Sequence, residues 1–135
     1  MPFDPTAFLA DPELLRTLTE HATPMVCDTA RVLFRQDAPA TGLFILHEGE
    51  VTLSMTSNEG RTILSTHARD GSLLGLPGLI GNQPYSLTAM AHAGARISYL
   101  SRPDFMALMQ SDAALSFKIL QVLAAEVRSA RQAIC

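Results

Sequence analysis

The clearest chemical pattern in this chain is the glycine-rich segment at residues 70–91, which reads DGSLLGLPGLIGNQPYSLTAMA. Pro77 suits the first turn of a short helix, and a loop that leads into a helix can hold an anion with its main-chain N–H groups. No side chain between Gly71 and Met90 is charged. The segment therefore has the backbone frame of a phosphate site, yet it lacks a side chain that would neutralise a phosphate. Four glycines permit sharp turns and the close approach of a ligand: Gly71, Gly75, Gly78 and Gly81.

Histidine and cysteine, the other residue types that bind metals or act as nucleophiles, are few and scattered. The nearest approach to a metal-binding cluster is the run HEGE at residues 47–50, at a predicted hairpin turn, whereas a metal-dependent oxygenase needs histidines and carboxylates that converge. Cys27 and Cys135 are too few for a disulfide framework, a zinc site or an iron–sulfur cluster. We therefore expect no catalytic residue, no bound metal and no cofactor.

Length and composition indicate one domain that spans residues 1–135. A chain of 135 residues, 47% of them hydrophobic, can bury a core of its own but is too short for two large domains. The net charge of −3 argues against direct contact with nucleic acid, which usually requires a basic stripe. No apolar run is long enough to cross a membrane, and the first residues lack the features of a signal peptide. We therefore expect a cytoplasmic protein without membrane contact.

Short strands broken by turns are predicted between residues 24 and 101. Residues 51–56, VTLSMT, alternate between apolar and polar types, as in a strand with one buried face. Turn residues recur about every 8–12 positions, a spacing typical of a compact sandwich, roll or barrel. A helix is predicted before this region, over residues 3–20, with a start signal at Asp11-Pro12.

The chain returns to helix at Ser101, and a long helix is predicted over residues 112–134. Glu126 and Ser129 continue the spacing of one apolar face on this helix. Because both are polar, we expect contact between this face and the strands to end at Val122. The apolar part of the face consists of Leu115, Ile119 and Val122.

A second stripe on the same helix repeats at the spacing of a coiled-coil seam. It spans about two heptads, shorter than a firm coiled-coil assignment needs. Two interpretations are therefore open: a helix buried on two sides within one domain, and a helix that pairs with its copy in a homodimer. We favour the homodimer, because an unpaired stripe would leave a contiguous apolar surface in water. The stripe consists of Leu120, Leu123, Val127, Ala130 and Ile134.

The order and spacing of these elements resemble the cyclic-nucleotide-binding-domain family, and most closely the sensor half of bacterial regulators of the catabolite-activator and fumarate-nitrate type. The resemblance implies a mainly β fold with α: an eight-stranded β-roll (a double-stranded β-helix or jelly roll) with a short helix between its sixth and seventh strands. An N-terminal helix and a long C-terminal helix would flank the roll. In such regulators the long helix leads into a DNA-reading domain, which this chain is not expected to contain. The resemblance covers residues 32–128 and rests on LFRQDAPATGLFILHEGEV (33–51), NEGRTIL (58–64), DGSLLG (70–75), PYSLTA (84–89) and ISYLSRPDFMALM (97–109).

The resemblance also implies where a ligand would bind. The long helix would cap the pocket, so that a ligand could meet Arg128, Ser129 and Gln132 from either subunit. Ligand binding and helix pairing would then be coupled. The rest of the site would be the cassette in the glycine-rich segment: Gly75, Leu76, Pro77, Tyr85, Ser86 and Leu87.

Two cassette positions depart from the nucleotide-binding members of the family. Leu76 stands where a glutamate would hold the ribose hydroxyl, and Tyr85 stands where an arginine would pair with the cyclic phosphate. Each charged contact is worth about 1.5–3 kcal/mol, so the loss of both would weaken nucleotide binding by roughly 10²–10⁴-fold. We therefore expect a non-enzymatic regulatory domain that does not bind cyclic AMP tightly.

Several outcomes for the pocket are open. Leu76 and Tyr85 could fill it and make it part of the core, or the pocket could take an apolar or aromatic small ligand with the Tyr85 hydroxyl as its handle. Ser86 and the backbone amides could still bind a nucleotide weakly. The alternative of another class is a cupin-like metal-dependent enzyme, which would need ligands inside the roll, such as His47 and a neighbouring glutamate.

Overall fold

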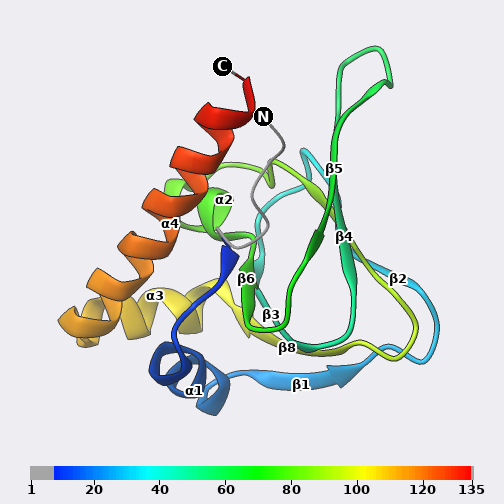
Figure 1. Ribbon diagram of the computed structural model, residues 1–135. Coiled ribbons are helices and arrows are strands. Elements are labelled where there is room, and N and C mark those ends of the chain that lie inside the picture. The colour runs from blue at the N-terminus through cyan, green and yellow to red at the C-terminus, as the bar shows by residue number, and fades with distance from the viewer. Residues whose placement is uncertain (1–7, 135) are drawn as a thin grey trace.

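Eight strands pair into two four-stranded antiparallel sheets that face each other and form a roll (Figure 1). The computed structural model describes residues 8–134, with side chains for residues 8–129. The predicted β-roll is confirmed. The first sheet has the order β1 (Thr23–Val26), β8 (Arg96–Ser101), β3 (Gly42–Glu48) and β6 (Ser72–Leu74). The second has the order β2 (Arg31–Phe34), β7 (Thr88–Ala91), β4 (Val51–Thr56) and β5 (Thr62–Ala68).

The helices gather along one side of the roll, beside the first sheet (Figure 1). The short helix α2 lies between the sixth and seventh strands, as the resemblance implies. None of the helices among the described residues is long and apolar enough to span a membrane. The four helices are α1 (Pro12–Glu20), α2 (Leu76–Gly81), α3 (Arg102–Ser111) and α4 (Ala113–Ile134).

Side-chain caps mark the helix starts that the sequence predicts. The Leu14 N–H donates to Asp11 Oδ1 at 2.8 Å, and the Leu115 N–H donates to Asp112 Oδ1 at 3.0 Å. Each cap satisfies a backbone donor that has no partner within its helix. These contacts confirm the predicted starts of α1 and α4.

The prediction of a helix over residues 3–20 is wrong at its beginning. Helix α1 starts only at Pro12, and Leu9 instead pairs with Ser72 in an isolated antiparallel bridge. The physical reason is that a proline ring clashes with helical backbone in the preceding residue. Asp11 is accordingly extended, with φ −69° and ψ 159°. Residues 3–7 of the predicted helix lie outside the described part of the chain.

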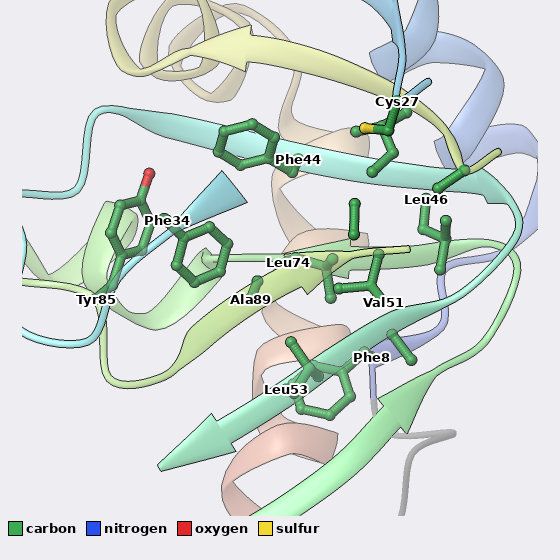
Figure 2. Packing of buried hydrophobic residues seen from close by; sticks show 14 residues of the cluster. Phe8, Cys27, Phe34, Phe44, Leu46, Val51, Leu53, Leu74, Tyr85 and Ala89 are labelled. Atoms are coloured by element: carbon green, nitrogen blue, oxygen red, sulfur yellow. The ribbon is translucent and has the colours of Figure 1, made fainter. Parts of the chain in front are cut away.

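Strand β3 is buried on both faces and separates two hydrophobic clusters. Phe44 and Leu46 point into the roll (Figure 2), whereas Leu43 and Ile45 point towards the helices. Successive side chains of a strand face opposite ways, so burial on both sides requires an unbroken apolar run. The cluster beside the helices also contains the predicted apolar face of α4, with Leu115, Ile119 and Val122.

Candidate functional site

A small cavity lies inside the roll, between helix α2 and helix α4. Its volume is about 20 Å³, which is room for a water molecule and not for a larger ligand. Most of the lining side chains are apolar. Within the described part of the chain, no lysine or arginine lines the cavity, so no cation stands ready for a phosphate.

The structure brings most of the predicted cassette to this cavity. Leu76 is the exception, since its side chain is fully buried in the cluster between the first sheet and the helices. A glutamate at this position would therefore be surrounded by apolar side chains rather than by the cavity. The cassette residues that do line the cavity are Gly75, Pro77, Tyr85, Ser86 and Leu87.

Gly75 allows the cassette to approach the roll closely. It precedes the first residue of α2 with a φ of +101°, which L side chains rarely adopt. A Cβ atom on Gly75 would also lie 2.9 Å from Tyr85 Cε1. Both the backbone conformation and the packing at this position therefore require glycine.

Tyr85 fills the end of the cavity where the resemblance places the phosphate-binding arginine. Its ring stacks on Phe34, with a centroid distance of 4.0 Å, inside the roll (Figure 2). Its hydroxyl donates to Gly42 O at 2.7 Å and accepts from Gly42 N at 3.1 Å and Thr41 N at 3.2 Å. The hydroxyl thus serves the backbone at the start of β3 and offers no free handle to a ligand.

Glu126 is a polar residue at the cavity that the sequence interpretation missed. The buried face of α4 was predicted to end at Val122, and this prediction is wrong. Glu126 is 6% exposed and Ser129 is 4% exposed, so both continue the buried face of α4 at the i, i+3, i+4 spacing. The same spacing, continued from Val122, could have predicted the burial of these two residues. Because both side chains are polar, the buried face was instead predicted to end before them.

The Glu126 carboxyl lies in an environment that disfavours its charge. It lines the cavity, and its Oε2 atom is buried without a hydrogen-bond partner among the described residues. Burial raises the pKa of this carboxyl from 4.5 to about 8, so the group is largely protonated at neutral pH. A buried polar atom without a hydrogen-bond partner needs an explanation. One explanation is a ligand that forms the missing hydrogen bond.

The three predicted ligand residues on α4 differ in where they lie. Arg128 is exposed, and the Gln132 side chain lies outside the described residues. Ser129 is buried, next along the same face as Glu126. Four apolar side chains also line the cavity, and nothing in the sequence marks them as part of a site. They are Phe8, Phe34, Leu53 and Leu74.

The outer side of α4 carries an apolar stripe that nothing covers among the described residues. Leu120 and Val127, two members of the predicted seam, are each 51% exposed. Phe117, which the seam prediction did not include, is 63% exposed and extends the stripe by one turn. Leu123 packs partly against the cluster beside the helices. The side chains of Ala130 and Ile134 lie outside the described residues.

His47 and its neighbouring glutamates do not converge on a metal site. His47 alternates with the inward-facing Leu46 and lies on the outer face of the first sheet, where its Nε2 is 2.7 Å from Ser98 Oγ. Burial and the nearby Arg96 cation lower the pKa of His47. Glu48 pairs with Arg96 at 3.4 Å, whereas Glu50 points to a different residue, His92, also at 3.4 Å.

The comparison with protein families agrees with this geometry. The family model for the cyclic nucleotide-binding domain matches residues 25–112, which include the whole roll except the start of β1, and also the cassette and α3. No curated protein sequence matches the chain.

Several solved structures share the fold at low sequence identity. The catabolite activator protein of Thermus thermophilus superposes with a TM-score of 0.79 at 21% identity, covering 97% of this chain and 62% of that one. A transcriptional regulator of Thermotoga maritima superposes with a TM-score of 0.75 at 18% identity, and the match covers 89% of this chain and 94% of that one. The sensor domain of the regulator DNR from Pseudomonas aeruginosa superposes with a TM-score of 0.68 at 20% identity, and the match covers 90% of this chain and 82% of that one. The chain thus spans less than two thirds of the catabolite activator protein.

Proposed function

Because the chain belongs to the cyclic nucleotide-binding domain family, we propose that it is a cytoplasmic, non-enzymatic sensor domain of a transcription regulator, with its effector site in the roll cavity. The position of Glu126 carries this proposal. A residue of the long helix α4 reaches the interior of the roll with an unpartnered oxygen. An occupant of the cavity would therefore touch the helix directly.

The lining of the cavity defines the class of effector. An effector must be small and largely apolar or aromatic, with a polar group that can pair with the Glu126 carboxyl. A phosphate is disfavoured, because no lining cation among the described residues would offset the cost of burying its charge. Ser86, which also lines the cavity, could bind a second polar group.

Effector binding would require the domain to rearrange. The cavity holds little more than a water molecule, since the chain's own side chains fill the roll. Phe8 and Tyr85 are among these side chains (Figure 2), and both are almost fully buried. Accommodating an effector would shift side chains that contact α4, and this movement is how binding at the roll would reach the outer face of that helix.

Cyclic AMP and cyclic GMP should bind in the millimolar range or not detectably. Tyr85 occupies the phosphate end of the cavity with a hydroxyl that is already bonded to backbone, and Leu76 points away from the cavity. Calorimetric titration with each nucleotide at neutral pH tests this expectation.

A micromolar dissociation constant in that titration would favour a second candidate function, weak or atypical nucleotide sensing. The observation behind this candidate is that Gly75 and Ser86 both line the cavity. Backbone amides and one hydroxyl would then suffice for the phosphate, and the argument from missing charged partners would fail.

The proposal that this domain is non-enzymatic rests on the position of His47. A cupin-like enzyme needs metal ligands that converge inside the roll, whereas His47 lies on the outer face of the first sheet and Glu48 pairs with Arg96. A stoichiometric metal that requires His47 for binding would contradict the sensor proposal.

We also propose that two copies pair through the exposed stripe of α4, which comprises Phe117, Leu120 and Val127. Wild-type protein at about 100 μM should sediment as a dimer, since even a weak interface would be populated at this concentration. Leu120→Glu combined with Val127→Glu should give a monomer, because two carboxylates would face their copies across the two-fold axis. Sedimentation equilibrium measures both species.

Gln110→Glu serves as the control for added charge, because it places a carboxylate on the exposed surface of α3 instead. This variant should remain a dimer. A wild-type monomer at the same concentration, or equal dissociation of the control, would mean that the stripe of α4 is not a self-association surface.

A further inference from the structure

Two histidines and a glutamate come together on the outer face of the second sheet, far along the chain from one another. They are Glu50, in the turn before β4, His67 on β5, and His92 just after β7. Each offers a ligand atom within 4.8 Å of those of the other two. The HEGE run that the sequence analysis singled out contributes only one member to this group, Glu50.

The backbone of the sheet fixes the relative positions of these three residues. Thr52, on the central strand β4, pairs in register with His67 on β5. The His92 N–H donates to Glu50 O at 2.9 Å, directly beyond the Val51–Ala91 pair of β4 and β7. Three adjacent strands therefore hold the group, and no loop has to close in order to assemble it.

Thr52 and Glu50 already contact the side chains of the two histidines. Thr52 Oγ1 lies 2.7 Å from His92 Nε2 and 3.4 Å from His67 Nδ1. His92 Nδ1 in turn lies 3.4 Å from Glu50 Oε2. The two imidazole rings meet edge to face, with 6.0 Å between their centroids. Since Glu50 and His67 are exposed and His92 is half-buried, an ion from solvent can reach the group.

We propose that Glu50, His67 and His92 bind a divalent transition-metal ion, with Zn²⁺ as the best match. Two imidazole nitrogens and one carboxylate oxygen are typical zinc ligands, and water would complete the tetrahedron. Imidazole disfavours Ca²⁺ and Mg²⁺, which prefer oxygen ligands. At Zn–N and Zn–O distances of about 2.0–2.2 Å, tetrahedral ligand atoms lie about 3.3 Å apart. The ligand atoms now lie within 4.8 Å of one another, and side-chain rotation would have to shorten these separations to about 3.3 Å.

The site is independent of the roll cavity. Its three ligands lie outside the roll, and none of them lines the cavity. A bound ion would cross-link β4, β5 and β7 at their outer face through coordination bonds. Because only the folded chain brings the three ligands together, the ion would also stabilise the native state.

Titration calorimetry of the purified, metal-free chain with ZnCl₂ tests this site. We expect one ion per chain with a micromolar dissociation constant, and a higher melting temperature in the presence of Zn²⁺. His67→Ala and His92→Ala should each weaken binding at least tenfold and remove most of the thermal shift. His21→Ala is the matched control, because it removes an exposed histidine next to α1 and should leave both readouts unchanged.

Two results would contradict a zinc site at these residues. Binding that is absent or far from stoichiometric in the wild type would refute the site, as would His21→Ala weakening Zn²⁺ binding as much as the other two variants do. Should an alanine variant lose its circular dichroism signature, His67→Gln and His92→Gln replace it, since glutamine is a poor zinc ligand that keeps a polar side chain on the exposed face of the sheet.

Discussion

Replacing Glu126 by glutamine should remove a large part of the decrease in stability that we expect for the wild type between pH 5 and pH 8. The pKa of this buried carboxyl is raised to about 8 in the folded chain, whereas in the unfolded chain the carboxyl ionises near pH 4.5. The folded state therefore holds one more proton in this interval, and the free energy of unfolding falls as pH rises. The slope approaches about 1.4 kcal/mol per pH unit, which amounts to several kcal/mol across the interval.

Urea denaturation of wild type and Glu126→Gln at pH 5, 6, 7 and 8 measures this difference. The variant should gain stability relative to the wild type with each step upward in pH, by a few kcal/mol in total. Glu59→Gln is the control, because it neutralises an exposed carboxylate in the turn between β4 and β5, and its difference from the wild type should not vary with pH. A Glu126→Gln difference that is the same at all four values would mean that the carboxyl reaches water.

Tyr85→Phe should destabilise the domain by about 2–4 kcal/mol. The substitution keeps the ring that stacks on Phe34 but removes the hydroxyl that bonds Gly42 O and the N–H groups of Gly42 and Thr41. Each buried backbone group left without a partner costs about 1–3 kcal/mol. The melting temperature and the urea midpoint should both fall.

Tyr99→Phe provides a closely matched control at the same segment. The Tyr99 hydroxyl also bonds the backbone here, donating to Thr41 O at 3.0 Å, but this contact is exposed to solvent. Water can replace it, so its loss should cost less than about 1 kcal/mol. Equal losses in the two variants would show that the Tyr85 hydroxyl is not part of a buried network.

Local sequence patterns sufficed for much of the fold. The caps Asp11 and Asp112, each with its backbone partner three residues on, mark helix starts through chemistry that involves only neighbouring residues. The alternation over residues 51–56 reflects a strand with one buried face, and the structure confirms it as β4. The glycine-rich segment also predicts α2 from local chemistry. Glycine readily adopts the positive φ that Gly75 has just before this helix.

The composition of the cavity and of the proposed metal site depends on which residues, distant in the sequence, lie next to one another in the folded chain. By itself the sequence predicted a β-roll with a long helix, and the resemblance to the family implied that Leu76 and Tyr85 stand where the charged partners of a nucleotide would lie. Only the tertiary structure decided that Leu76 turns away from the cavity, that Glu126 turns into it, and that His67 and His92 meet Glu50. The polarity of residues along one helix does not reveal that Glu126 is buried, since burial is set by packing between elements. Strand register, fixed by hydrogen bonds between segments far apart in the chain, likewise decides which histidines face each other.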